Sequence, residues 1–532
     1  MRAESSYAVA EQRVRLLQRH PQAFGHPVEG AVECIETHIS WVLLAGGFAY
    51  KFKKPLRLDV LDFSTVAQRR AACEDELRIN RRTAPALYLG LVALVPDAAD
   101  GPRLLPLGDA PFHAEPAVQM RRFAQDALLV HALERQELLP EHIDSLARHV
   151  ARFHADAAVA APAQGWGTAQ AVRSAVDECV DALRPLLHPA PPLAALLEPV
   201  AAWCLREGEA LAPVFQQRLA DGHVRECHGD LHLANIALIE GQPQLFDAIE
   251  FNPALRWIDC VADIAFVVMD LAAHGRADLG WRFANLWLEQ SGDYAGLSVL
   301  RYYLVYRAVV RAWVAGARMA QACGDSALAL EVQTYLELAA RVISSTSQPP
   351  TLWLAHGFSG AGKSTHALAL ACARGMVRVR ADVERKRLFG LTPEAGSGGV
   401  PGGIYTAEAT RRTYDRLIQV ADDALAAGFS AVVDATFLDP AARSRFITLA
   451  QQRGVPGRVL SFEAPLEVLR ERVIQRAALG LDASEAGLAV LESQWATALP
   501  LAPWEEALAV HVDTTRPVDW NALLPLTSDG RE

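Results

Sequence analysis

The chain has 532 residues, 51% of them hydrophobic and 21% charged, and a formal net charge of -11 at pH 7. This length fits roughly two to four domains, and the acidic balance disfavours a general nucleic-acid binder, because such proteins need clustered Lys and Arg. Eight cysteines without a CxxC pair indicate reduced thiols, and there is neither an apolar leader nor a run of about 18 apolar residues, so we expect a cytoplasmic protein without membrane contact.

The first part of the chain predicts a small antiparallel sheet followed by a helix. Short apolar runs alternate within residues 32–54, and Gly46-Gly47 fits a hairpin turn. Ser64-Thr65 can cap a long helix that runs through Arg82. Further strands are expected at 90–95 and 117–120, and a mostly helical region from 125 to 219.

The motif His228-Gly229-Asp230 begins an HxDxxxxN pattern that ends at Asn235, and a later predicted strand ends at Asp247. In a kinase catalytic loop one Asp accepts or orients the acceptor hydroxyl, the Asn holds magnesium, and a later Asp bridges metal and phosphates. We therefore assign these roles to Asp230, Asn235 and Asp247. The alternative is a polar loop followed by a turn-forming Asp.

With these motifs, residues 30 to 340 resemble the aminoglycoside phosphotransferase and choline kinase branch of the protein-kinase-like fold. The resemblance implies a small sheet lobe, a helical lobe, and a strand Lys that pairs with the phosphates and with a helix Glu. Lys51 and Lys53 point to one face of their strand by alternation. We choose Lys51, and Glu76 over Glu74, while a surface charge remains the alternative for either lysine.

One departure from this family lies between the first two predicted strands, where residues 36–38 hold no glycine-rich GxGxxG lid. Glycine lets the backbone approach phosphates closely, so its absence leaves open a grip by Thr37 and Ser40, or a degenerate kinase domain. Asp259 and Asp263 resemble the acidic positions that anchor the helix after the metal loop, which implies a structural role.

The polar, proline-closed segment from Ser344 to Pro350 cannot continue a helix, so we place a domain boundary there. The predicted domains are residues 1–345 and 346–532. No internal repeat is evident, and the nucleotide motifs of the two parts belong to unrelated folds.

The segment after this boundary contains a complete GxxxxGK[ST] phosphate-binding loop between an apolar strand and a helix-prone stretch. Backbone N–H groups and the helix N-terminus can hold an anion there, Lys363 can reach the β- and γ-phosphates, and Ser364 can ligate magnesium. A tight turn without a ligand is the alternative. The predicted nucleotide-binding residues are Gly357, Ser359, Gly360, Ala361, Gly362, Lys363, Ser364 and Thr365.

Two later strand ends carry acidic residues. Residues 377–381 read as a strand that ends at Asp382, which can accept the proton of an acceptor hydroxyl, with Arg385 one helical turn later to orient the acceptor or a phosphate. The Gly/Pro-rich stretch 391–403 predicts a mobile loop over the acceptor. A buried strand ends at Asp434, a second magnesium or water anchor. Capping and turn roles are the alternatives for both aspartates.

Arg472 and Arg476 stand four residues apart on one predicted helix face, before a small-residue loop at 477–486. The pattern resembles a lid that carries phosphate-reading arginines. Such an arginine can accelerate phosphoryl transfer by roughly 10³ to 10⁵, because charge grows on the phosphoryl oxygens in the transition state. An exposed helix charge is the alternative for each.

Taken in order, the motifs of residues 350 to 515 resemble the small P-loop kinases: gluconate kinase, the zeta-toxin-like kinases and the polynucleotide 5'-hydroxyl kinase domain. The two-part layout also resembles a bacterial two-domain family labelled AAA-type ATPase or aminoglycoside phosphotransferase-like. The expected fold class is an α+β protein-kinase-like N-terminal domain followed by an α/β P-loop domain with a parallel sheet.

We therefore expect a phosphotransferase that uses ATP and Mg²⁺ and acts on a hydroxyl of a small molecule or nucleotide. Two alternatives stay open: a regulatory, nucleotide-sensing ATPase with a degenerate first domain, and a polynucleotide 5'-hydroxyl kinase that acts on a nucleic-acid end. The acceptor and the oligomeric state are not predicted by these patterns.

Overall fold

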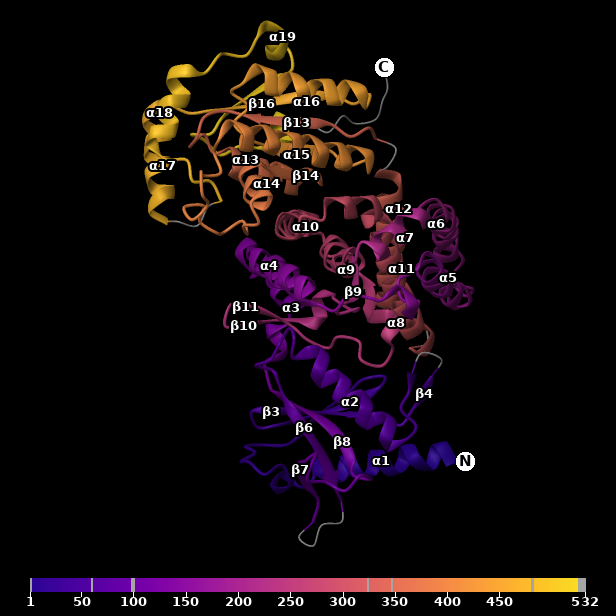
Figure 1. The fold of residues 1–532 in the computed structure, drawn as a ribbon. Helices are drawn as coiled ribbons and strands as arrows, with labels where there is room; N and C mark the ends of the chain where they lie inside the picture. The colour runs from indigo at the N-terminus through magenta and orange to yellow at the C-terminus, as the bar shows by residue number, and fades with distance from the viewer. Residues whose placement is uncertain are drawn as a thin grey trace. The chain divides into compact units, whose positions relative to one another are not determined.

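The computed structural model describes residues 2–58, 61–96, 101–322, 325–345, 348–479 and 483–524. The chain forms two compact units (Figure 1): unit 1 comprises residues 1–172 and 215–267, and unit 2 comprises residues 173–214 and 268–532. Among the helices of the described ranges, none combines the length and the apolar character needed to cross a lipid bilayer.

Unit 1 begins with a six-stranded antiparallel sheet in the order β1-β2-β3-β8-β6-β7. The hairpin between β2 and β3 turns at Gly46-Gly47, as predicted. Buried Trp41, Leu43, Tyr50 and Phe52 form much of the core on this sheet. The strands are β1 (Glu33–Glu36), β2 (Ser40–Ala45), β3 (Phe48–Lys53), β6 (Tyr88–Val95), β7 (Arg103–Pro106) and β8 (Glu115–Arg121), with the small pair β4 (Arg57–Leu58) and β5 (Leu61–Asp62).

Helix α2 (Val66–Asn80) packs against β6 and β8. The hydroxyl of Thr65 accepts a hydrogen bond from the Gln68 N–H at 3.2 Å, and the Gln68 side chain accepts one from the Thr65 N–H at 3.0 Å. This capping box fixes the start of the helix where the sequence predicts it. The helix buries Cys73, Glu76 and Ile79 toward the sheet.

The remainder of unit 1 is helical with short strand pairs. The strands β9 and β12 pair with each other, as do β10 and β11, and the segment that carries the HGD motif follows β9. Other elements of this part are α1 (Arg2–Gln18), α3 (Leu129–Glu134), α4 (Pro140–Asp156), α7 (Ala212–Ala220), β9 (Val224–Glu226), β10 (Ile236–Ile239), β11 (Gln242–Leu245), α8 (Pro253–Arg256), β12 (Trp257–Asp259) and α9 (Cys260–Ala273).

Unit 2 contains a helical layer in which α11 packs against both α6 and α12, and α6 packs against α12. Its long helices repeat Leu, Val, Tyr and Ala at helical spacing, which buries one side of each helix. The helices are α5 (Ala169–Leu186), α6 (Pro191–Ala210), α10 (Ala277–Ser291), α11 (Leu297–Gln321) and α12 (Ser326–Ser344).

The rest of unit 2 is built on a five-stranded parallel sheet in the order β14-β15-β13-β16-β17. Helices α13, α15 and α16 pack on this sheet, and α10 contacts both α13 and β14. The elements are β13 (Leu352–His356), α13 (Lys363–Arg374), β14 (Val377–Arg380), α14 (Ala381–Leu388), α15 (Ala407–Ala426), β15 (Ala431–Asp434), α16 (Pro440–Gln452), β16 (Gly457–Glu463), α17 (Leu466–Leu479), α18 (Leu488–Thr497), α19 (Pro503–Glu506), β17 (Ala509–Asp513) and α20 (Trp520–Leu523).

The predicted fold class is confirmed: an α+β kinase-like part precedes an α/β P-loop part with a parallel sheet. Asp382 does not end a strand but is the second residue of α14, because β14 stops at Arg380. The boundary predicted at 345/346 falls inside unit 2, because residues 173–214 and 268–345 pack with the P-loop part. The seven described cysteines are free thiols, and Cys323 lies outside the described residues.

Candidate functional site

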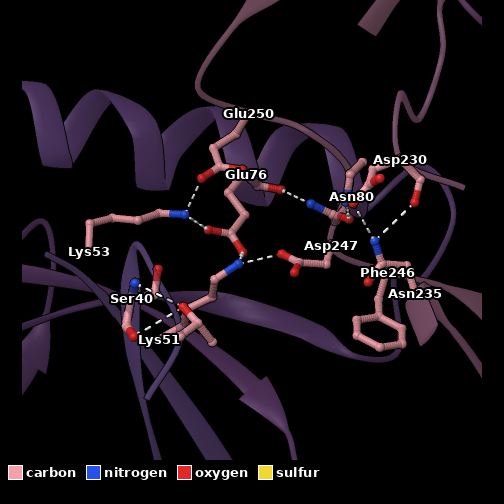
Figure 2. A network of polar contacts seen from close by, with 12 residues as sticks. Ser40, Lys51, Lys53, Glu76, Asn80, Asp230, Asn235, Phe246, Asp247 and Glu250 are labelled. Atoms are coloured by element: carbon pink, nitrogen blue, oxygen red, sulfur yellow. Dashed lines mark hydrogen bonds and ion pairs between the residues drawn. The ribbon is translucent and has the colours of Figure 1, made fainter. Parts of the chain in front are cut away.

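A buried group of alternating charges lies between β3 and α2 in unit 1 (Figure 2). Lys51 Nζ lies 2.8 Å from Glu76 Oε1 and also pairs with Asp247. Lys53, two residues along the same face of β3, lies 2.5 Å from Glu76 Oε2 and pairs with Glu250. Burial alone would lower the pKa of Lys51, but Asp247 and Glu76 raise it well above its ordinary value. The structure thus brings the predicted Lys51, Glu76 and Asp247 together.

The choice between the two candidate glutamates has a clear structural basis. Glu74 is exposed, whereas Glu76 is fully buried and forms ion pairs with both lysines. Lys53 and Glu250 were not assigned a role from the sequence. Their signals were present, since Lys53 alternates with Lys51 and Glu250 lies three residues after Asp247, but neither spacing identifies a pair 197 residues apart.

The HGD segment is held in place by buried Asp263, the second residue of the acidic pair predicted to be structural. Its carboxylate accepts from the backbone N–H groups of His228 at 3.1 Å and Gly229 at 2.9 Å. Gly229 has φ of +86°, and a Cβ there would lie 2.6 Å from the carbonyl oxygen of Leu255. Only glycine fits this turn without displacing backbone, so the local chain fixes the position of the residue that follows it, Asp230.

Asp230 and Asn235 meet at the end of this loop. The Asn235 amide donates to the backbone oxygen of Asp230 at 2.9 Å and to its carboxylate at 3.0 Å (Figure 2). Because the Asn235 NH₂ group faces Asp230, its amide oxygen is left as an acceptor for a cation. The contact matches the spacing from which both residues were predicted.

Asp247 has a left-handed backbone conformation, with φ of +61°. Its N–H donates to the Tyr88 hydroxyl at 3.0 Å, and the next N–H, of Ala248, donates to Asn80 at 2.9 Å. Burial would raise the pKa of Asp247, but the adjacent Lys51 outweighs it and lowers the pKa. Carboxylate and amide oxygens are ligands that Mg²⁺ accepts, so the Asp247 and Asn235 side chains fit such an ion by their chemistry.

The turn between β1 and β2 holds itself together. The Thr37 hydroxyl donates to the Ser40 carbonyl at 3.1 Å and accepts from the Ser40 N–H at 3.0 Å. Ser40 is fully buried, so its hydroxyl does not face a ligand, whereas Thr37 is exposed. Of the two residues predicted to contact phosphates at this turn, only Thr37 is therefore at the surface.

In unit 2 the phosphate-binding loop joins β13 to α13, and α13 begins at Lys363. Gly360 has φ of +84°, and a Cβ there would lie 2.6 Å from the Leu469 carbonyl oxygen. The loop is tight because α17 packs directly against it. The Ser359 N–H donates to the Gln494 side chain on α18 at 2.9 Å, a contact that the sequence did not predict.

Lys363 is the centre of charge in this site. Its Nζ donates to the Phe358 carbonyl at 2.7 Å, and burial lowers its pKa to about 8. The carboxylates of Asp434 and Asp382 oppose that shift, and the cation of Arg476 adds to it. Asp434, Asp382 and Arg476 are therefore close enough to Lys363 to act on its charge, and all four residues are predicted from separate motifs.

Two arginines of β14 each contact one of the residues that are predicted to bind magnesium in unit 2. Arg378 donates to the Ser364 carbonyl at 2.9 Å, and Arg380 Nε lies 3.6 Å from Asp434 Oδ2. Asp434 ends β15 and is buried. Hydroxyl and carboxylate oxygens suit Mg²⁺, so the Ser364 and Asp434 side chains fit the ion that the motif implies.

A helix outside the P-loop segment positions these arginines. Glu289 on α10 lies 2.6 Å from Arg378 Nη2 and 3.8 Å from Arg380 Nη1, and it is 3% exposed. Asn285 on the same helix accepts from the Arg378 N–H at 2.6 Å and donates to the Met376 carbonyl at 2.9 Å. Because β14 is the edge strand of its sheet, Asn285 satisfies backbone groups that no further strand pairs.

Arg385 and the Gly/Pro-rich stretch meet at the other side of α14. Arg385 is 7% exposed, donates to the Ile404 carbonyl at 3.1 Å and to the Thr410 hydroxyl at 3.2 Å, and lies over the Tyr405 ring. Residues 391–403 form no helix or strand, as predicted, and Ser397 bonds Glu485. The structure therefore places Arg385 against the residues that directly follow this loop.

The two arginines predicted to read phosphates have different surroundings. Arg472 donates to Thr514 Oγ1 at 2.9 Å and to the Thr514 carbonyl at 2.8 Å, which ties α17 to the end of β17. Arg476 donates to the Ala486 carbonyl at 2.6 Å and acts on Lys363 through its charge. Arg472 also donates to the Gly360 carbonyl of the phosphate loop at 3.4 Å, so both arginines lie near this site. The predicted lid loop at 477–486 begins later than expected, since α17 runs to Leu479, and residues 480–482 lie outside the described residues.

Comparisons with known proteins give relatives for both units. Residues 352–501 match a family model described as an AAA domain. The uncharacterized protein Rv2004c of Mycobacterium tuberculosis is 32% identical over 491 residues, 89% of this chain and 93% of the relative. An unliganded sugar kinase structure from Janibacter is 24% identical and covers 32% of this chain and 88% of its own, with a TM-score of 0.25. A choline/ethanolamine kinase family structure from Mesorhizobium loti is 10% identical and covers 64% and 95%, with a TM-score of 0.36.

Proposed function

Because this chain belongs to the family of the mycobacterial protein Rv2004c, which it matches along nearly its whole length, we propose one function for the whole two-unit chain. It is an ATP-dependent phosphotransferase with a nucleotide site in each unit. The P-loop site of unit 2 transfers the γ-phosphoryl group of Mg-ATP to a hydroxyl of a small molecule or nucleotide.

One observation carries this proposal: the loop before Lys363, Asp382 and Asp434 all lie at the carboxyl ends of the neighbouring parallel strands β13, β14 and β15, and α17, which carries Arg476, packs against that loop. In the proposed reaction the loop N–H groups and Lys363 hold the β- and γ-phosphates, and Arg476 offsets the charge that develops on the transferred group. Asp382 accepts the proton of the attacking hydroxyl.

Ser364 and Asp434 would hold a magnesium ion in unit 2, and Asn235 and Asp247 would hold one in unit 1. When bound, the ion supplies charge neutralisation of the phosphate oxygens. In unit 1, Lys51 orients the phosphates while Glu76 holds the Lys51 ammonium in place, and Asp230 orients or deprotonates an acceptor. The contacts of Lys51 with Glu76 and Asp247 support a kinase-like site in unit 1.

A nucleotide-sensing role for unit 1 has one observation in its favour. The turn between β1 and β2 has no glycine-rich lid, and the Thr37 hydroxyl is bonded to the backbone of Ser40. Phosphates bound below this turn would have fewer backbone donors than in a glycine-rich loop. Unit 1 would then bind nucleotide without turning it over.

Magnesium-dependent release of ADP by the full chain tests the proposal, with and without a pooled metabolite extract. Lys363→Ala should lower turnover by about 100-fold or more, because it removes a donor to the transferred phosphoryl group. Arg476→Ala should lower it strongly as well, whereas Arg470→Ala on the exposed side of the same helix should not. Full turnover by Lys363→Ala would rule out unit 2 as the transferring site.

Asp230→Ala separates the two roles of unit 1, with exposed Asp221→Ala as the matched control. A loss of part of the extract-stimulated rate would make unit 1 a second kinase. An unchanged rate would leave unit 1 as the sensing unit. ADP release that no extract stimulates and that Asp382→Asn does not change would favour a regulatory ATPase over phosphoryl transfer.

A further inference from the structure

A cavity of about 360 Å³ lies within unit 2, away from the phosphate-binding loop. Its walls come from the end of α9 that belongs to unit 2 (from Val268 onward), α10, α11 and α12 on one side, and from residues that precede β13, β14 and β15 on the other. These strands are parallel, and the phosphate loop, Asp382 and Asp434 all follow their carboxyl ends. The cavity therefore lies at the amino-terminal ends of these strands, and the proposed transfer site lies at their carboxyl ends.

The charged side chains among the lining residues are all arginines: Arg301, Arg341 and Arg374. No Asp, Glu or Lys is among the described residues that line the cavity. This is unusual in a chain with a net charge of -11, in which acidic residues outnumber Lys and Arg. A concave site with one sign of charge concentrates ligands of the opposite sign.

Backbone carbonyls hold Arg301 and Arg374, whereas Arg341 pairs loosely with a carboxylate. Arg301 donates to the carbonyls of Ala427 at 2.5 Å and Gly428 at 2.7 Å. Arg374 donates to the Trp520 carbonyl at 3.0 Å, and its buried Nε has no partner among the described residues. Arg341 is 60% exposed, and its nearest carboxylate, of Glu337, is 4.0 Å away. Carbonyl partners fix a guanidinium but leave its positive charge uncompensated.

The body of the cavity is apolar and aromatic. The Trp281 and Phe429 rings lie 5.6 Å apart in an edge arrangement, and the Arg301 guanidinium lies 4.0 Å from the centroid of the Phe429 ring. Met269 and Leu304 complete this part of the wall. The volume is within the range of small-molecule sites, which are mostly apolar with a few polar groups that orient the ligand.

We propose that this cavity binds a small organic anion with a flat apolar body. The flat body lies against Trp281 and Phe429, and the anionic group meets the guanidinium groups of Arg341 and Arg374. Such a ligand contacts both the helical layer and the residues that lead into β14 and β15. It is a separate ligand from the nucleotide and the acceptor of the proposed reaction.

Two fluorescent probes of nearly the same shape test this proposal on the full chain. 8-Anilinonaphthalene-1-sulfonate carries a sulfonate, and N-phenyl-1-naphthylamine has the same flat body without it. Titrations are made with excess Mg-ATP present, so that the nucleotide sites are filled. We expect one saturable sulfonate site per chain. Arg341→Gln and Arg374→Gln should each weaken it by about tenfold, since each removes one charge-assisted contact.

The same two variants should change binding of the neutral probe by less than about twofold, and Trp281→Leu should weaken both probes. Arg206→Gln, an exposed arginine on α6 outside the cavity, is the matched control and should leave both affinities unchanged. Thermal melts identify any variant that fails to fold. If Arg374→Gln does not fold, Arg341→Gln still tests the proposal, because Arg341 is exposed. The proposal is overturned if Arg341→Gln binds the sulfonate as tightly as the unaltered chain, or if no saturable sulfonate site exists.

Discussion

At the scale of single residues, the properties of Lys363 come from competition between burial and charge. Burial lowers its pKa to about 8, even though two carboxylates oppose the shift. Because its pKa is lowered, Lys363 binds fewer protons in the folded chain than in the unfolded chain at any pH between about 8 and the ordinary value of 10.5. The free energy of unfolding therefore rises with pH in this range. A bound polyphosphate should reverse the shift by favouring the ammonium form.

Binding of Mg-ATP at pH 8 should therefore be accompanied by uptake of roughly half a proton at this site. Calorimetry in buffers of different ionisation enthalpy measures that number. Lys363→Met should abolish the uptake, and repeating the titration at pH 6.5, where the lysine is already protonated, should give almost none. Equal uptake by the Lys363→Met chain would show that another group titrates.

The paired glutamates of α2 offer a matched comparison in unit 1. Glu76→Gln leaves Lys51 and Lys53 buried with one carboxylate each, so it should lower the local free energy of unfolding by roughly 3 kcal/mol. Glu74→Gln changes an exposed residue and should cost less than about 0.5 kcal/mol. Hydrogen exchange of peptides from β3 and α2 measures both. Similar costs for the two variants would show that the buried network does not stabilise this lobe.

At the scale of elements, α10 acts as a support for β14 and hence for the strand ends that carry the site. Glu289→Gln would leave buried Arg378 with a neutral partner, while Arg380 keeps the Asp434 carboxylate. We expect the variant to weaken binding of Mg-ATP to unit 2 by about tenfold or more, because Arg378 holds the Ser364 carbonyl. Exposed Glu178→Gln on α5 serves as control. Unchanged affinity of Glu289→Gln for Mg-ATP would mean that α10 stabilises the fold but does not contribute to nucleotide binding.

The elements also show what sequence patterns can and cannot predict. Caps such as Thr65 and Asp439, the glycine turn at 46–47 and the phosphate loop are local, so spacing alone locates them. β7 was missed because its four residues have no clear alternation. The contact of Glu289 with Arg378 joins residues 89 positions apart, and no local pattern encodes it. For the same reason the motifs predicted Lys51 and Glu76 but neither Lys53, the second partner of Glu76, nor Glu250, which pairs with Lys53.

At the scale of the whole chain, the unit that contains the phosphate loop also contains residues 173–214 and 268–345. A fragment of residues 346–532 lacks Asn285, so the backbone groups of Met376 and Arg378 lose their partner at an exposed sheet edge. Amide exchange of β14 should be at least about tenfold faster in this fragment than in the full chain. Equal amide protection of β14 in the fragment and the full chain would show that the P-loop part stabilises this edge strand without α10.

The central claim is that each unit holds its own Mg-ATP site, and equilibrium dialysis of a non-hydrolysable ATP analogue with magnesium tests it most directly. We predict that the unaltered chain binds two molecules. The Lys363→Ala and Lys51→Met chains should each bind one molecule, and the double variant should bind none. A single bound molecule in the unaltered chain, lost completely in Lys363→Ala, would contradict a nucleotide site in unit 1 and with it the two-site account.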